Sequence, residues 1–249
     1  MAKSTANTKA TGPADQLLVT WHGHSTWSIA LGDYHLLIDP FLDDNPVAKT
    51  KAESINPTHI LVSHGHYDHI ADAASIAKRT GAQVLANFEI ATWLSKHHGV
   101  KHTVGMNLGG AFSCGAGRFQ LVPALHSSSL PDGSYGGTAG GWVLDLHVNE
   151  TTSRRIYYAG DTALFSDMQW TARKPVDLLI VPIGDLFTMG VEDSIEATRF
   201  LHPKWVMPTH YDTWPPIAQD AVNWGERIRH ETEASPIIPA IDASWTLPL

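Results

Sequence analysis

The sequence predicts a chain of the α/β class (α+β) that folds as a four-layer αββα sandwich, and three observations support this prediction. Short apolar runs typical of strands alternate with stretches in which apolar residues recur every three or four positions, as in helices. Strands come first and β/α units follow, and this order occurs twice, which indicates two similar halves with helices outside. The chain has 249 residues, 43% hydrophobic and 17% charged, and can therefore bury a sizeable core.

The first half is expected to contain strands and two helices. The strands cover Leu17–Trp21, Thr26–Leu31, His35–Ile38, His59–Ser63 and Val84–Ala86. The run HILVS at His59–Ser63 is typical of a strand buried on both faces of a sheet. Helices are predicted over Ala71–Arg79, ended by Gly81, and over Glu89–His98, ended by Gly99.

The second half is expected to repeat this order. Its strands cover Arg118–Ala124, Gly141–Val148, Arg154–Ala159, Asp177–Ile183 and Lys204–Met207. A helix is predicted over Val191–Leu201, where Glu192 and Asp193 in the first turn interact favourably with the helix dipole. A last helix is predicted near Ile217–Arg229.

Composition limits the classes of function. A net charge of −8, from 17 Lys and Arg against 25 Asp and Glu, argues against a nucleic-acid partner, which requires clustered cations. The only cysteine, Cys114, excludes an intramolecular disulfide and a thiolate zinc cluster, and is expected to be a small buried residue. Histidine, the commonest metal ligand in proteins, is unusually frequent at 15 positions.

Residues 1–15 are expected to form a disordered tail, and residues 16–249 a single domain. The tail lacks the apolar segment of a secretory signal, and no stretch approaches the roughly 20 apolar residues of a transmembrane helix. We therefore expect a cytoplasmic protein without a membrane partner, while the sequence leaves open whether it forms a homo-oligomer.

The central motif is SHGHYDH at Ser63–His69, directly after the buried strand of the first half. Three imidazoles and a carboxylate within six residues suit a divalent metal with nitrogen and oxygen ligands. Open α/β sheets place their sites at the carboxyl ends of strands, and Gly65 permits a tight turn that lets His64 and His66 face one point. A histidine-rich surface loop, the alternative, would match this motif by chance in roughly a few chains per thousand.

Three more candidate ligands follow predicted strands: His126, Asp161 and His210. Each residue alone is weak evidence for a metal site. Together, however, all three follow the ends of predicted strands, which is the arrangement that a metal site built from several strands requires. The candidate ligands are then seven: His64, His66, Asp68, His69, His126, Asp161 and His210. Seven are too many for one tetrahedral zinc and suit two metal ions, with Asp161 as the bridge because its carboxylate can give one oxygen to each.

These residues and their order from Trp21 to Tyr211 resemble the metallo-β-lactamase superfamily of hydrolases, whose hallmark is H-x-H-x-D-H followed by His, Asp and His. The resemblance implies that one ion is bound by His64, His66 and His126. It implies that the second is bound by Asp68, His69 and His210, with Asp161 bridging the two.

Further segments resemble the branch of that superfamily that includes ascorbate-6-phosphate lactonase: WHGHST at 21–26, IDPF at 38–41, GDT at 160–162 and FTMG at 187–190. More distantly, the phospholipase D that cleaves N-acyl phosphatidylethanolamine has a similar Gly-His pair near its start. His24 belongs to this pair, and we expect it to contact the substrate or a metal ligand. His22 stands where the branch usually has an apolar residue, and is expected at the surface, outside the site.

The expected function is that of a metal-dependent hydrolase in which a metal-bridging hydroxide cleaves a small-molecule ester, lactone or phosphodiester. Zinc fits the ligands best, and manganese, iron, nickel or cobalt are alternatives. Asp68 is expected to orient the hydroxide or to transfer a proton, and is thus, with His24, a candidate catalytic residue. A nuclease of the same superfamily and a non-catalytic metal-binding protein are the competing hypotheses.

Two features are expected around the site. The Gly/Ser-rich segment 127–141 is expected to form a flexible loop beside the metals, either lining the substrate site or forming an ordinary surface loop. Trp142, Phe187, Tyr211 and Trp214 lie near candidate ligands in the sequence, and either wall the pocket or belong to the core.

Overall fold

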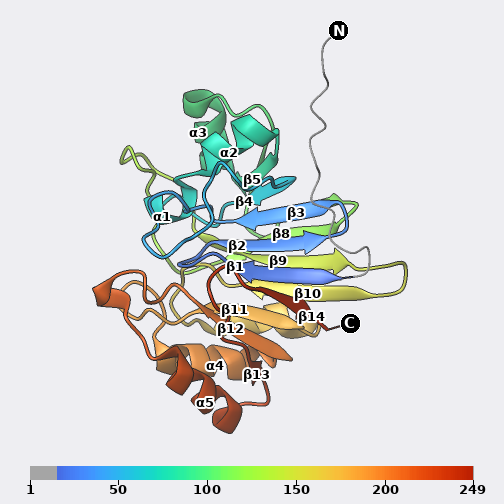
Figure 1. Cartoon of the computed structure of the whole chain (residues 1–249), viewed down its shortest axis with the longest axis vertical. Coiled ribbons are helices and arrows are strands. Elements are labelled where there is room, and N and C mark those ends of the chain that lie inside the picture. The colour runs from blue at the N-terminus through green and yellow to red at the C-terminus, as the bar shows by residue number, and fades with distance from the viewer. Residues whose placement is uncertain (1–15, 249) are drawn as a thin grey trace.

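The computed structural model describes residues 16–248, which form two seven-stranded sheets with helices outside them (Figure 1). The expected disordered tail, residues 1–15, lies outside the described residues, as does Leu249. The four-layer αββα sandwich predicted from the sequence is confirmed. Each half of the chain contributes one sheet, except that the last strand, β14, joins the first sheet.

The first sheet has the strand order β14-β1-β2-β3-β4-β5-β6. Its strands are β1 (Leu17–Trp21), β2 (Trp27–Leu31), β3 (Tyr34–Ile38), β4 (His59–Leu61), β5 (Gln83–Asn87), β6 (Thr103–Met106) and β14 (Ser244–Leu247). Strands β14 to β3 pair antiparallel, and β3 to β6 pair parallel. The carboxyl ends of β3 and β4 therefore lie at the same edge of the sheet, where the metal-binding motif begins.

The second sheet has the order β13-β12-β11-β10-β9-β8-β7 and repeats this design. Its strands are β7 (Ala111–Cys114), β8 (Gly117–Pro123), β9 (Gly140–His147), β10 (Ser153–Tyr158), β11 (Leu178–Pro182), β12 (Trp205–Thr209) and β13 (Ser235–Pro236). Strands β7 to β10 pair antiparallel and β10 to β13 parallel, which confirms the prediction of two similar halves.

Helices cover the parallel part of each sheet. The helices are α1 (Tyr67–Ile70), α2 (Ala73–Thr80), α3 (Phe88–His98), α4 (Val191–Leu201) and α5 (Ala221–Glu231), with 3₁₀ helices η1 (Ser166–Arg173) and η2 (Pro215–Ile217). Figure 1 shows α2 and α3 at the top and α4 and α5 at the bottom, with the strands between them. None of the described helices has the length and apolar character needed to cross a membrane.

The main core lies between the two sheets. Trp27 from the first sheet and Trp142 from the second are fully buried in one cluster of apolar side chains. A second cluster packs α2 and α3 against the outer face of the first sheet. Along β4, Leu61 belongs to the main core, whereas Ile60 and Val62 belong to the second cluster, which confirms that this strand is buried on both faces.

The strands that the sequence analysis missed are β6, β7, β13 and β14, which are the four edge strands of the two sheets. Edge strands are short and partly exposed, and so lack the apolar runs that mark interior strands. Cys114, expected to be buried, is only half-buried because it lies on the edge strand β7.

Two predicted helices begin later than expected. The helix expected over Ala71–Arg79 begins at Ala73, after Asp72, whose carboxylate does not cap the helix but accepts the backbone N–H of Leu42 at 2.6 Å. The helix expected near Ile217 begins at Ala221, after Asp220, whose side chain caps it. The predicted glycine ends of α2 and α3 are confirmed, because Gly81 and Gly99 have φ angles of 75° and 68°.

Candidate metal centre

The seven predicted metal ligands follow strands of both sheets: five lie on loops, and Asp68 and His69 lie on the short helix α1. The motif Ser63–His69 follows β4, His126 follows β8, Asp161 follows β10 and His210 follows β12. These strand ends lie at one edge of the sandwich, so the structure brings all seven side chains together. The contacts divide them into two groups joined by Asp161.

The first group, here termed the three-histidine cluster, consists of His64, His66 and His126. The Nε2 atom of His64 lies 3.0 Å from Nδ1 of His66, which in turn lies 3.3 Å from Nε2 of His126. His64 is fully buried, whereas the other two are half-buried. Three ring nitrogens that face one point, all within 4.8 Å of one another, can hold one metal ion.

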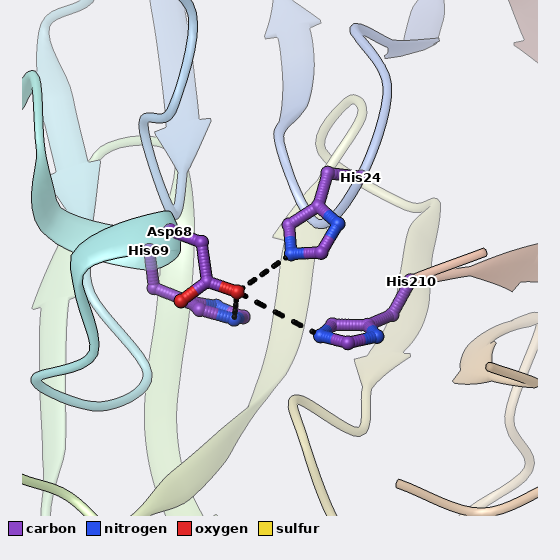
Figure 2. Close-up of side chains that lie close together, drawn as sticks. All are labelled: His24, Asp68, His69 and His210. Carbon is purple, nitrogen blue, oxygen red and sulfur yellow. Dashed lines mark hydrogen bonds and ion pairs between the residues drawn. The ribbon is translucent and has the colours of Figure 1, made fainter. Parts of the chain in front are cut away.

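The second group, here termed the carboxylate cluster, consists of His24, Asp68, His69 and His210, whose ligand atoms also lie within 4.8 Å of one another. Figure 2 shows the three imidazoles arranged around one carboxylate oxygen of Asp68. This Oδ2 atom lies 2.8 Å from Nε2 of His24, 3.7 Å from Nε2 of His69 and 3.9 Å from Nε2 of His210. The cluster contains the residues expected around a second ion, together with His24.

Asp161 lies between the two clusters. Its Oδ2 atom is 3.0 Å from Nε2 of His210 and 3.3 Å from Nε2 of His69, both in the carboxylate cluster, and 3.7 Å from Nε2 of His126 in the other cluster. Gly160 precedes it with a φ angle of 68°, and a Cβ atom there would lie 2.6 Å from a backbone carbonyl oxygen of β9. The turn that presents Asp161 therefore requires glycine.

Asp39 is a site residue that the sequence analysis noted only as part of a family segment. Its buried carboxylate accepts hydrogen bonds from Nδ1 of His69 at 2.8 Å, the hydroxyl of Tyr158 at 2.7 Å and the backbone N–H of Ser63 at 2.7 Å. Because Tyr158 belongs to the second sheet and Ser63 follows a strand of the first, Asp39 connects both sheets to the site. It fixes the ring of His69 so that Nε2 faces Asp161.

His24 connects Asp68 to the wall of the site. Its Nε2 atom lies 2.8 Å from Oδ2 of Asp68, and its Nδ1 atom lies 2.8 Å from the hydroxyl of Thr213. The ring of Trp214 packs edge-on against it, with 4.8 Å between the ring centroids. His24 is thus held on both ring nitrogens, in contact with a candidate ligand, as the sequence predicted.

Three site residues have a left-handed backbone conformation: His24, Asp39 and His210 have φ angles of 52°, 46° and 55°. This conformation is uncommon for residues other than glycine and is concentrated at functional sites, where the surrounding fold maintains it. Each of the three follows a strand directly or within three residues, so the strained turns serve to aim these side chains.

Burial controls the charge of most site histidines. It lowers the pKa of His64 well below its usual value and also lowers the pKa values of His66 and His126. These rings are therefore neutral near pH 7 and present a lone pair. Burial, together with the neighbouring His210, lowers the pKa of His24 to about 4.

The carboxylate cluster favours positive charge at His69. Burial lowers the pKa of this ring, but Asp161, followed by Asp68 and Asp39, outweighs burial and raises the pKa well above its usual value. Burial likewise raises the pKa of Asp161, but His210 and His69 outweigh it and hold that pKa well below its usual range. The carboxylates are thus anionic, as metal ligands must be.

Three buried polar atoms of the candidate ligands lack a hydrogen-bond partner among the described residues: Nε2 of His69, Oδ1 of Asp161 and Nδ1 of His210. A buried polar group left unsatisfied costs about 1–3 kcal/mol, and a metal ion between the clusters would satisfy Nε2 of His69 and Oδ1 of Asp161. The donor set therefore fits a divalent metal ion.

His22 does not lie at the surface as expected, because its exposed fraction is only 6%. Its Nε2 atom lies 2.7 Å from the hydroxyl of Ser28, and its Nδ1 atom bonds to the carboxylate of Asp242. The sequence analysis missed this burial because Asp242 is more than two hundred residues away in the chain. None of these partners is a candidate ligand.

The four aromatic residues near the ligands differ in position. Trp142 and Tyr211 belong to the main core, whereas Trp214 is half-buried and lies against His24. Phe187 is 55% exposed. Of the four, Trp214 contacts a residue of the site, because its ring packs against His24.

The segment 127–141 lies beside the ligands, as predicted. The hydroxyl of Ser127 is 3.3 Å from Nε2 of His66. The hydroxyl of Ser128 accepts the backbone N–H of Gly65 at 3.0 Å and donates to the carbonyl of Gly136 at 2.9 Å. Ser128 therefore fixes the turn of the metal-binding motif.

Comparison with known proteins agrees with this arrangement. Residues 34–211 match the family described as beta-lactamase superfamily domain, a range that includes all seven candidate ligands. The chain is 48% identical over 204 residues to a UPF0173 metal-dependent hydrolase of Methylacidiphilum infernorum, covering 81% of this chain and 88% of the relative. It is 46% identical over 213 residues to a UPF0173 metal-dependent hydrolase of Thermus thermophilus, covering 86% and 92%.

A solved structure is similar over nearly the whole chain. Igni18, described as a novel metallo hydrolase from the archaeon Ignicoccus hospitalis, superposes with a TM-score of 0.84 at 29% identity, covering 94% of this chain and 99% of Igni18. Family match, relatives and fold thus agree with the metal-binding geometry. The chain belongs to the metallo-β-lactamase superfamily, within its UPF0173 family of metal-dependent hydrolases.

Proposed function

We propose that this hydrolase works with two divalent metal ions, one at the three-histidine cluster and one at the carboxylate cluster. The observation that carries the proposal is the position of Asp161, whose Oδ2 atom lies within 3.7 Å of ring nitrogens from both clusters. A carboxylate in this position can give one oxygen to each of two ions about 3.5–4 Å apart. Zinc suits the nitrogen-rich donors, and manganese, iron, nickel and cobalt are alternatives.

When bound, such a pair of ions activates water at neutral pH and polarises the bond to be cleaved. Proton transfer and positioning are then the roles of the protein side chains. Asp68 is the candidate to take a proton from the attacking water at Oδ2 and to return it to the leaving group. His24 is a positioning residue, because its Nε2–H donates to Oδ2 of Asp68 while Thr213 holds its other ring nitrogen.

For the substrate we propose a small-molecule ester or lactone. The described ion pairs of Asp68 and Asp161 have only histidine partners, and no lysine or arginine of the described chain pairs with these carboxylates. Sites that bind phosphodiesters usually add arginine or lysine to hold the phosphate. Phosphodiester and nuclease activity are therefore the second choice. The lactonase-like activity and the cytoplasmic location stay predictions from the sequence.

The test combines metal analysis with a substrate panel. We expect the purified, metal-loaded protein to contain two equivalents of metal per chain by inductively coupled plasma mass spectrometry. We expect it to hydrolyse p-nitrophenyl esters or lactones faster than bis(p-nitrophenyl) phosphate. The control variant His66→Ala should lose one of the two equivalents of metal, and its turnover with it.

Three results would contradict parts of the proposal. Turnover confined to bis(p-nitrophenyl) phosphate would replace the ester assignment by phosphodiester chemistry. Bound metal without turnover of any compound would favour the non-catalytic metal-binding hypothesis. Full activity of His66→Ala would overturn the site itself.

A further inference from the structure

A cavity of about 720 Å³ lies on the second sheet, and none of the candidate metal ligands lines it. Strands β8, β9 and β10 form its floor, and η1 forms a wall. Its floor residue Tyr157 is next to Tyr158, whose hydroxyl reaches Asp39 near the first sheet. Because successive side chains of a strand point to opposite faces, the cavity opens on the face that points away from the first sheet. Its volume is typical of small-molecule sites.

Three cations at this cavity have no acidic partner among the described residues: Arg118, Arg173 and Lys174. Nη1 of Arg118 donates to Oε1 of Gln120 at 3.0 Å, and Nε of Arg173 donates to the carbonyl of Trp170 at 3.0 Å. Both acceptors are neutral, so they orient the guanidinium groups without neutralising them. Against these three cations the lining has one acid, Asp167, so the cavity carries an excess of positive charge in a chain of net charge −8.

A fourth cation, Arg155, builds the cavity. Its Nε and Nη2 atoms donate to the carboxylate of Asp145 at 2.8 Å and 2.9 Å, and its Nη1 atom donates to the carbonyl of Thr171 at 3.2 Å. Because Thr171 belongs to η1, this ion pair fastens the wall to the floor. The positions of the residues that line the wall are thus fixed by the sheet.

The cavity also offers a flat ring and a phenol. Trp170 on η1 is 64% exposed, and the guanidinium of Arg173 lies 5.7 Å from the centre of its ring. Tyr157, a floor residue, lines the cavity although the residue as a whole is only 1% exposed. A phenol that lines a cavity can hydrogen-bond to a ligand through its hydroxyl.

We propose that this cavity binds an anionic ligand that carries a flat ring, with the size and chemistry of a mononucleotide. Arg118, Arg173 and Lys174 surround the anionic group, since guanidinium forks match phosphate oxygens. Trp170 stacks on the ring, and the hydroxyl of Tyr157 hydrogen-bonds to the ligand. This site is separate from the metal centre and does not depend on the proposed hydrolysis.

The test is isothermal titration calorimetry of adenosine monophosphate into the whole chain as purified. We expect Arg118→Gln to weaken binding at least roughly tenfold, through loss of a charge-assisted contact. Trp170→Ala should weaken binding about fivefold or more, through loss of stacking. The matched control is Arg229→Gln, because Arg229 is exposed on α5 and does not line the cavity, and it should change binding less than about twofold.

Three further titrations test whether the cavity needs both halves of the ligand and whether the metal centre takes part in binding. Inorganic phosphate and adenosine should each bind at least about tenfold more weakly than the nucleotide, because each lacks one half of the contacts. His66→Ala should bind the nucleotide as the natural chain does, and this variant is included because phosphate groups can also bind to metal ions.

Four results would overturn the proposal. The first is absence of nucleotide binding, and the second is equal losses in Arg118→Gln and Arg229→Gln, which would mean non-specific attraction. The third is loss of binding in His66→Ala with retention in Arg118→Gln. The fourth is a dimer in sedimentation that Trp170→Ala dissociates, which would mean that a second copy of the chain covers this face.

Discussion

The three-histidine cluster and the carboxylate cluster differ in what surrounds their histidines. In the three-histidine cluster, neutral imidazoles face one another, and His66 and His126 are half-buried. In the carboxylate cluster, His69 is fully buried, with Asp39 behind its ring and Asp161 in front. A carboxylate behind a histidine fixes the ring and strengthens metal binding. Two ions bound at these clusters would therefore differ in affinity. The ion at the carboxylate cluster would be held tightly, and the ion at the three-histidine cluster would exchange more readily.

The largest effect is expected from Asp161→Ala, because this side chain serves both clusters. We expect the variant to lose nearly all bound metal and its kcat/KM to fall at least roughly a thousandfold. Metal analysis of the dialysed protein and kinetics on the best substrate of the panel would measure both. If the variant kept one full equivalent of metal, the clusters would be independent of each other.

A matched pair of variants, His66→Ala and His69→Ala, compares the clusters directly. We expect His66→Ala to keep about one equivalent of metal, held as tightly as the tighter ion of the natural chain. We expect His69→Ala to lose the tight ion and about 3–5 kcal/mol of stability, because it leaves buried carboxylates unpaired. Chelator competition measures the metal affinity, and thermal unfolding measures the stability. Equal metal affinities of the two variants would contradict the expected difference between the clusters.

Asp39→Asn tests the support behind the carboxylate cluster. The side chain accepts four donors at its two oxygens, from Ser63 (backbone N–H and hydroxyl), His69 and Tyr158, so an amide nitrogen in place of one oxygen faces a donor. We expect the affinity for the tighter ion to fall roughly 10–100-fold while the weaker ion is unaffected. Tyr158→Phe is the control, since it removes one hydrogen bond but keeps the carboxylate, and should change affinity much less.

The smallest effect is expected from Thr213→Val, which removes the hydroxyl that holds Nδ1 of His24. The loss of one buried hydrogen bond costs about 0.5–1.5 kcal/mol, so kcat should fall roughly 2- to 12-fold at unchanged metal content. A loss of metal in this variant would mean that His24 is itself a ligand, because its ring orientation would then control metal binding.

The interior of the fold and the clustering of the candidate ligands were predictable from the sequence because their signals are local. The run HILVS is apolar along its length because both faces of β4 are buried, and the motif SHGHYDH follows it without a gap. The edge strand β14 has no such signal, since it becomes a strand through pairing with β1 at the other end of the chain.

The residues that support the site were not predictable, because their partners are distant in the sequence. Asp39 is one aspartate after a strand, and its role arises from donors on three residues that lie 24, 30 and 119 positions further along the chain. The burial of His22 depends in the same way on Asp242. Periodicity and motif spacing report neighbours along the chain, whereas these contacts depend on how the two sheets meet.

The crossing of β14 to the first sheet has a consequence for biosynthesis. Leu247 pairs with Leu17, and just before β14 the backbone N–H of Asp242 donates to the carbonyl of Trp21 at 2.7 Å. Until these residues have been synthesised, the outer edge of β1 has no strand paired to it. An unpaired edge can join the edge of another nascent chain. In a variant cut before Asp242, neither the strand beside β1 nor the hydrogen bond at Trp21, which precedes the turn to His24, would form.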